Sequence, residues 1–152
     1  MGSRLATAPR SVLGRSLTYR LHQLHKITDL ESQQSYVDAV GLSLSDGRCL
    51  ATIGSFGPLS VNELAAQSNL NKSQASRAAQ FLVERGLVEK VGHPEDGRGV
   101  LLSLTAAGRR LWLRTIRMVE ERNAQIFGCL SAREQAVLSD MFDRLIEHNR
   151  RA

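Results

Sequence analysis

Aromatic residues, prolines and long apolar runs are all scarce in this chain of 152 residues. Only 5% of the residues are aromatic and three are proline, which is typical of a helix-rich globular protein and excludes collagen-like and low-complexity classes. No apolar run approaches the roughly 18 residues of a transmembrane helix, and the segment Met1–Ala6 lacks the apolar core of a secretory signal. We therefore expect a cytoplasmic protein without a membrane partner.

Cysteines and the short motifs of common enzymes are also few or missing. The two cysteines, Cys49 and Cys129, lie far apart in apolar surroundings, which indicates reduced core thiols rather than a disulfide framework. The sequence has no glycine loop that would cradle a phosphate, no nucleophile elbow and no paired metal-ligand motif. We expect a protein that is not an enzyme and has no cofactor.

Positive charge is in modest excess and is unevenly distributed. Lysine and arginine number 20 against 15 acidic residues, which gives a net charge of +5. The excess lies in two blocks, residues 1–30 and residues 71–117. Such blocks allow a polyanionic partner, but an excess of this size is also common in proteins that bind none.

Leucine spacing predicts a long helix near the start of the chain. Its apolar residues recur every three or four positions and so share one helical face. They are Leu13, Leu17, Leu21, Leu24 and Ile27. The helix should run from Leu13 to about Ser35, after a disordered tail over residues 1–12.

Two amphipathic helices are predicted at the other end of the chain. Thr105 is a suitable N-cap for a helix over residues 106–127, and Ser131 with Glu134 forms a capping box that opens a last helix. The apolar face of that last helix comprises Val137, Leu138, Met141, Leu145 and Ile146. Because no sheet is predicted to cover the terminal helices, their apolar faces favour a helical homodimer.

Between these ends, the sequence predicts short helices followed by a hairpin. One helix should follow Ser45 and turn Leu50 and Ile53 inward. The next elements are a helix from the capping box of Ser60 and Glu63 to about Ser68, a helix from the N-cap Asn71 to Arg85, and strands over Leu87–Val91 and Val100–Leu104. A close helix pair followed by a two-stranded hairpin is the order of a winged helix-turn-helix, whose second helix enters the DNA major groove.

The second helix of that pair has a small apolar face and a polar outer face. The inward residues are Ala75, Ala78, Ala79 and Leu82, and the outward residues are Lys72, Ser73, Gln74, Ser76, Arg77 and Gln80. Short hydrogen-bonding and cationic side chains reach base edges and phosphates without steric conflict. A polar outer face alone does not indicate DNA binding, because any solvated helix face is polar. The interpretation as a recognition helix therefore depends on the order of the surrounding elements.

Three segments of the chain resemble the MarR family of bacterial transcriptional regulators: Asn71–Arg77, Leu82–Val88 and His93–Gly108. The resemblance implies a mainly α fold with a small β-hairpin wing, in a single domain over residues 13–150. It also implies a homodimer that represses genes from a pseudo-palindromic double-stranded DNA operator. A small molecule or an oxidant would release that repressor.

The resemblance also divides the domain into two parts. A winged helix-turn-helix lobe would occupy about residues 44–105, with the recognition helix over about 72–85 and the wing over about 88–104. The dimerisation helices would occupy about 13–36 and 106–150.

The resemblance assigns the DNA contacts to the recognition helix and the wing. Ser73, Gln74, Ser76 and Arg77 would face the major groove, and Lys72 would face the DNA backbone. Gln74 suits adenine, while Arg77 suits either guanine or a phosphate. Arg98, at the hairpin tip, would reach the neighbouring minor groove, and Asp96 would orient that tip.

A sensing site beside the first helix is the second implication of the resemblance. Arg20 falls within the leucine stripe, His22 and His25 lie toward its border, and Tyr19 lies on the far side. A guanidinium on an apolar stripe needs a counter-charge. Either an intersubunit ion pair or a bound small carboxylate would supply it.

Gly47 adds an argument about the effector. Many relatives have a large aromatic residue at this position, and a glycine within a helix costs roughly 0.5 to 1 kcal/mol relative to alanine. The vacated volume beside Arg20, His25 and Arg48 would suit an aromatic acid, although a neighbouring side chain would fill it equally well. Several relatives sense phenolic, benzoic or nicotinic acid derivatives, so we expect an aromatic or heteroaromatic carboxylate of the hydroxybenzoate or hydroxynicotinate type.

Three alternatives to this interpretation stay open. Peroxide sensors of the family carry a reactive cysteine near the start of the first helix, which this chain lacks, so a redox switch would fall to Cys49. For metal sensing, His22 and His25 offer two ligands without an evident third. The last alternative is a dimeric interaction module that has lost DNA binding, and the basic face with Lys72 and Arg77 argues against it.

Overall fold

The computed structural model describes residues 8–92 and 99–150 and is mainly helical. Its elements are α1 (Ala8–Arg15), α2 (Leu17–Val40), α3 (Leu44–Phe56), α4 (Val61–Ser68), α5 (Lys72–Glu84), β1 (Val88–Gly92), β2 (Val100–Leu104), α6 (Ala106–Phe127) and α7 (Ala132–Arg150). The chain divides into two compact units, one up to Ile116 and one from Arg117. No helix in the described ranges is both long and apolar enough to cross a bilayer.

The first predicted helix is two helices, which corrects the expectation of one helix preceded by a tail to residue 12. Helix α1 begins at Ala8, because Pro9 fits the first turn, where its missing N–H has no helical partner to lose. Ser16 then interrupts the helix with an extended backbone, and its Oγ accepts a hydrogen bond of 3.2 Å from the Tyr19 N–H. The serine therefore acts as the N-cap of α2 rather than as an interior residue.

Helix α2 also extends further than Ser35 and ends at Val40. Gly41 follows it in the left-handed region (φ +69°), the usual position of a C-terminal glycine cap. The guanidinium of Arg114 in α6 donates a 2.6 Å hydrogen bond to the carbonyl of Ala39. This cation satisfies a carbonyl in the last turn of α2, where the helix dipole favours positive charge.

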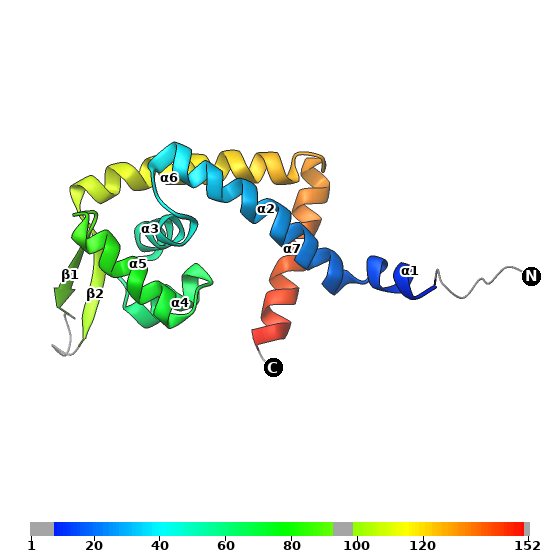
Figure 1. The fold of residues 1–152 in the computed structure, drawn as a ribbon, viewed down its shortest axis with the longest axis horizontal. Coiled ribbons are helices and arrows are strands. Elements are labelled where there is room, and N and C mark those ends of the chain that lie inside the picture. The colour runs from blue at the N-terminus through cyan, green and yellow to red at the C-terminus, as the bar shows by residue number, and fades with distance from the viewer. Residues whose placement is uncertain (1–7, 93–98, 151–152) are drawn as a thin grey trace, which may run out of the picture. The chain divides into compact units, whose positions relative to one another are not determined.

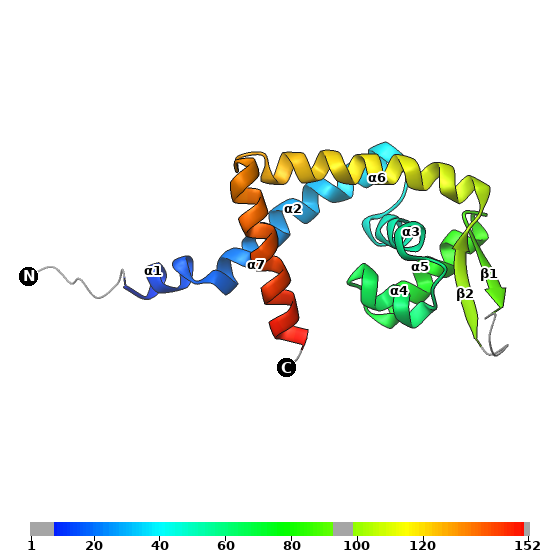
Figure 2. The ribbon, with the colours of Figure 1, turned by 180° about the vertical axis from the view of Figure 1, so that it is seen from behind.

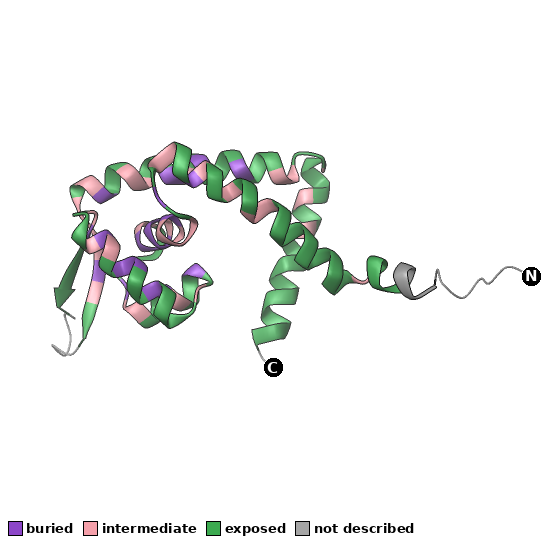
Figure 3. Ribbon diagram, viewed as in Figure 1, coloured by how far each residue is buried: buried purple, intermediate pink, exposed green. Residues whose placement is uncertain are grey.

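Helices α3, α4 and α5 pack side by side and bury the main hydrophobic core of the first unit (Figures 1 and 2). Leu50 and Ile53 of α3 are buried in it, as predicted. Figure 3 shows the buried residues gathered on the facing sides of these helices. Helix α3 begins at Leu44, two residues earlier than expected, because the N-cap is Ser43 and not Ser45, and the Ser43 Oγ accepts from the Asp46 N–H.

The predicted capping box of α4 is confirmed, and the predicted N-cap of α5, Asn71, is confirmed as part of a second capping box. Ser60 and Glu63 exchange bonds of 2.9 and 3.1 Å, and Asn71 and Gln74 exchange bonds of 2.8 and 3.2 Å. Asn69, in the left-handed region at φ +60°, ends α4 and allows the short turn into α5. These local interactions fix the helix pair that the sequence predicted.

The hairpin is antiparallel and is held against the helices at its base. The register pairs Val88 with Leu104 and Gly92 with Val100. Leu59, between α3 and α4, exchanges two backbone hydrogen bonds of 2.8 and 3.2 Å with Leu102 of β2. Residues 1–7, 93–98 and 151–152 lie outside the described part of the chain, so the tip of the hairpin does too.

The start of α6 is fixed to this unit at two places. Thr105 is the predicted N-cap and accepts from the Gly108 N–H at 3.0 Å, while its hydroxyl donates to the Gly86 carbonyl at 2.7 Å. A side chain at Gly108 would collide with the backbone carbonyl of Leu87, so only glycine allows α6 to approach the backbone just before β1 this closely.

In the second unit, α7 begins at the predicted capping box of Ser131 and Glu134, with bonds of 2.9 and 3.2 Å. Those bonds also lower the pKa of the Glu134 carboxyl. No residue of α7 is buried, and its predicted apolar face is open along much of its length (Figure 3). Cys129, in the turn before α7, is exposed, so the expectation of two core cysteines is wrong for this one.

Candidate functional site

The outer face of α5 is presented to solvent as predicted. Lys72, Ser73, Gln74, Ser76, Arg77 and Gln80 are exposed, whereas Ala75, Ala78, Ala79 and Leu82 are buried. The alanines allow α5 to pack closely on α3 and α4, and the same packing turns the polar residues outward. Helix α5 is therefore held in place by its buried face and has an accessible polar face.

Gln74 has a structural task that the sequence interpretation did not give it. Its Oε1 accepts a 3.2 Å hydrogen bond from the Asn71 N–H in the capping box of α5. Bidentate pairing with adenine uses both the oxygen and the nitrogen of a glutamine amide. Base reading and helix capping would therefore use the same amide oxygen, of which the cap already takes one lone pair.

Arg77 is exposed on the second turn of α5. Among the residues that the structure describes, no carboxylate or other side chain pairs with its guanidinium. Because the residue is exposed, its guanidinium donors are accessible to a ligand.

A further cation near this face was missed by the sequence interpretation. Lys90 of β1 reaches Gln80 of α5, with 3.3 Å between Nζ and Oε1. Alternation along a strand would have indicated it, because Lys90 shares a strand face with the buried Val88 and so points toward the helices. Arg98 and Asp96, the predicted wing residues, lie outside the described residues.

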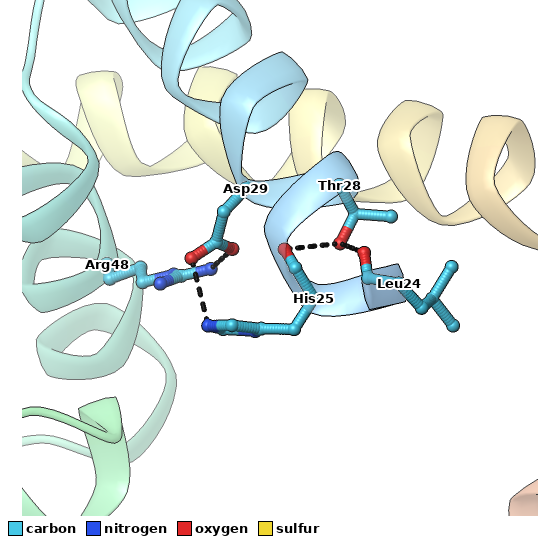
Figure 4. A network of polar contacts seen from close by, with 5 residues as sticks. All are labelled: Leu24, His25, Thr28, Asp29 and Arg48. Atoms are coloured by element: carbon cyan, nitrogen blue, oxygen red, sulfur yellow. Dashed lines mark hydrogen bonds and ion pairs between the residues drawn. The ribbon is translucent and has the colours of Figure 1, made fainter. Parts of the chain in front are cut away.

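A polar network joins α2 to α3 (Figure 4). Asp29 accepts a 2.8 Å charged hydrogen bond from Arg48 and lies 3.2 Å from His25 Nε2, so one carboxylate links both residues. Sequence interpretation named His25 and Arg48 but missed Asp29. The spacing of His25 and Asp29, one helical turn apart, was the available signal.

The other predicted sensing residues are not part of this network. Arg20 and His22 are exposed, and the Tyr19 hydroxyl accepts a hydrogen bond from Gln23, with 3.5 Å between Nε2 and Oη. Arg20 precedes Asp29 by about 13 Å along the axis of α2. The network therefore gathers His25 and Arg48 but not Tyr19, Arg20 or His22.

The space predicted beside Gly47 is occupied by a neighbouring side chain. The ring of Tyr36 lies directly against Gly47, so closely that a Cβ there would overlap it. The phenol is buried, and burial raises its pKa while the charge of Arg48 opposes that shift. Of the two outcomes considered for the vacated volume, the chain's own tyrosine fills it, and no empty ring-sized space remains at this position.

Replacing Gly47 with alanine is expected to destabilise the protein by about 1 to 3 kcal/mol, because the Tyr36 ring must move within a packed core. Denaturant unfolding measures this change. Gly14→Ala is the matched control, since Gly14 is also helical and has open space around it, and its free energy of unfolding should stay the same or rise. Equal stability of the Gly47 variant and the unaltered chain would contradict the close packing.

Cys49 is a poor candidate for redox chemistry. Its side chain is fully buried among the core residues of α3, α4 and α5. Burial raises the pKa of the thiol to about 11, while the neighbouring Ser68 hydroxyl opposes the shift. At neutral pH the thiolate, which is the form that reacts with peroxides, is therefore scarce. Within the described ranges, no three His, Cys, Asp or Glu side chains are placed to hold a metal ion.

Comparison with known proteins gives consistent matches. The sequence model of the MarR family matches residues 40–99. The HTH-type transcriptional regulator YxaD of Bacillus subtilis is 30% identical over 96 residues, which cover 63% of this chain and 67% of YxaD. The transcriptional repressor Rv2887 of Mycobacterium tuberculosis is 27% identical over 106 residues, or 70% of this chain and 76% of that protein.

Solved structures agree with these matches. A crystal structure of Rv2887 in complex with salicylic acid superposes with a TM-score of 0.69 at 25% identity, covering 86% of this chain and 96% of Rv2887. A MarR/EmrR family regulator from Acinetobacter sp. ADP1 superposes with a TM-score of 0.83, covering 92% and 99% of the two chains. At 24% identity, this second match is evidence of a shared fold only.

Proposed function

The chain belongs to the MarR family of transcriptional regulators, which bind DNA, and on that premise we propose that it is a dimeric repressor released from its operator by a small aromatic carboxylate. The observation that carries this proposal is the outer face of α5, where Lys72, Ser73, Gln74, Ser76 and Arg77 are exposed on a helix held by buried alanines. The relatives are transcriptional regulators rather than enzymes.

We assign the major-groove contacts to Ser73, Gln74, Ser76 and Arg77 and a backbone contact to Lys72. Ser73, Ser76 and Arg77 have no side-chain partner among the residues that the structure describes. They can therefore bond to base edges and phosphates without first breaking a hydrogen bond or ion pair to those residues. Arg98 remains the proposed minor-groove contact of the wing.

Dimerisation is supported by two apolar stripes that the single chain leaves open. Leu17, Leu21, Leu24, Ile27 and Leu30 of α2 are each about half exposed or more, and so are Val137, Met141, Leu145 and Ile146 of α7. Soluble monomers rarely expose contiguous apolar faces of this size. A two-fold dimer buries both stripes and presents two copies of α5 to a pseudo-palindromic site.

For the effector, we propose a hydroxybenzoate- or hydroxynicotinate-type acid whose carboxylate takes the place of Asp29 on Arg48. Asp29 already shows that Arg48 holds a carboxylate in this position, at 2.8 Å. The aromatic ring would pack near the phenol of Tyr36, which lies beside Arg48. Salicylic acid bound to the relative Rv2887 supports the same class of ligand.

Fluorescence anisotropy of a labelled duplex from the intergenic region upstream of the gene tests the proposed function. The purified chain should bind this duplex more tightly than a scrambled duplex, and one of the hydroxybenzoates or hydroxynicotinates tested should weaken that binding. Selective binding unaffected by every acid would overturn the effector class only. Absence of selective binding would favour the interaction-module alternative.

Replacing Asp29 with asparagine is expected to tighten salicylate binding by about tenfold, or about 1.4 kcal/mol, because the acid no longer competes with an internal carboxylate for Arg48. Isothermal titration calorimetry measures the affinity. Asp38→Asn is the control, because it makes the same charge change on α2 at a residue bonded to Gln34 instead. Unchanged or weaker salicylate binding in the Asp29 variant would show that Arg48 is not the partner of the acid.

A further inference from the structure

Lys90 lies at the junction between the hairpin and the outer face of α5. Its Nζ is 3.3 Å from Oε1 of Gln80, the only side-chain hydrogen bond between β1 and α5 among the described residues. Val88, two residues earlier, lies on the same face of the strand and is buried. The direction of Lys90 is therefore set by the pleat of β1, which points it toward α5.

Gln80 is oriented at both ends of its amide. Its Nε2 donates a 3.1 Å hydrogen bond to Glu84, one helical turn on, which leaves Oε1 turned toward Lys90. Gln80 also follows Ser73, Ser76 and Arg77 at helical spacing, so it shares their exposed face.

The ammonium of Lys90 keeps donors for another ligand. An ammonium has three N–H donors, and Gln80 occupies one of them. In the part of the chain that the structure describes, no carboxylate lies within ion-pair distance of Lys90. Within residues 8–92 and 99–150, the lysine is thus a positive charge that is oriented by Gln80 and has no counter-charge.

We propose that Lys90 binds a phosphate of the DNA strand that separates the major groove occupied by α5 from the neighbouring minor groove. This inference rests on the proposed function. If α5 enters the major groove and the hairpin flanks the next minor groove, the sugar-phosphate backbone between these grooves crosses the junction of α5 and β1. Lys90 lies at that junction, and a lysine suits a phosphate because it acts as a point charge.

Replacing Lys90 with glutamine tests this contact through the salt dependence of DNA binding. The slope of log affinity against log salt should become shallower by about 0.9 for each subunit of the dimer, the value for one lost phosphate contact. The change should be equal on the upstream intergenic duplex and on a scrambled duplex, since phosphates carry no sequence information. Lys90→Arg, which keeps the charge, should retain the original slope.

Lys26→Gln is the matched control, because Lys26 is exposed on α2, a helix with no proposed DNA contact. Its slope should equal that of the unaltered chain. A Lys90→Gln variant that keeps its thermal unfolding midpoint and the original slope would overturn the lysine contact while leaving the proposed function intact. If the unaltered chain itself shows no salt-dependent binding to either duplex, the proposed function fails, and this inference fails with it.

Discussion

The variant Leu145→Glu is expected to be a monomer at micromolar concentration, whereas the unaltered chain is expected to be a dimer. Leu145 is 56% exposed in the single chain and lies on the open apolar face of α7. A glutamate at this exposed position should lower the stability of the isolated subunit only a little. In the proposed dimer it would bury an unpaired carboxylate in each subunit, at a cost of several kcal/mol.

Sedimentation equilibrium measures the mass directly, and Ala136→Glu is the control. Ala136 is also exposed on α7 but lies on the opposite side of the helix from Leu145. The control variant should remain dimeric and bind DNA normally, whereas the Leu145 variant should lose at least a hundredfold in operator affinity, because one lobe reads only half of the site. A dimeric Leu145 variant would show that this face of α7 is not the interface.

Local signals in the sequence were enough to predict most element boundaries. Ser60, Asn71, Thr105 and Ser131 are all N-caps as predicted, because a cap is a contact between residues three apart and needs no knowledge of the fold. The break at Ser16 was missed for a related reason. The leucine stripe continues through it, and periodicity alone does not distinguish a serine that caps from a serine that the helix tolerates.

The polar network was only partly predictable, because it depends on how two helices pack. His25 and Asp29 are neighbours on α2 and could have been paired from their spacing, but Arg48 joins them only when α3 lies against α2. The same holds for Tyr36, since the occupant of the space beside Gly47 comes from another helix. A glycine in a helix indicates close approach but does not identify the approaching group.

Under the proposed function, the network provides a route by which an acid would release DNA. The bond between Asp29 and Arg48 ties α2 to α3, and α3 packs directly on α5. A ligand shifts a conformational equilibrium only through unequal affinity for the two states. An acid that replaces Asp29 breaks a bond between helices as it binds, so it stabilises any state in which α2 and α3 have separated.

The variant Arg77→Ala is expected to lose about 30-fold to 10⁴-fold in operator affinity. Each arginine that pairs with a guanine contributes about 1 to 3 kcal/mol of discrimination, and the dimer carries two. Arg77 is exposed, and its guanidinium is unpaired among the described residues, so removing it breaks no hydrogen bond or ion pair with them and should leave the thermal unfolding midpoint unchanged.

Fluorescence anisotropy on two duplexes separates the possible partners of Arg77. If it pairs with guanine, Arg77→Ala loses far more affinity for the upstream intergenic duplex than for a scrambled duplex, and Arg77→Lys does not restore the difference, because lysine lacks the planar fork. If it pairs with a phosphate, both duplexes weaken together and lysine restores most of the binding. Arg133→Ala, at an exposed site in the first turn of α7, removes the same charge and should change neither affinity. Unaltered operator affinity in Arg77→Ala would remove α5 from the proposed DNA interface.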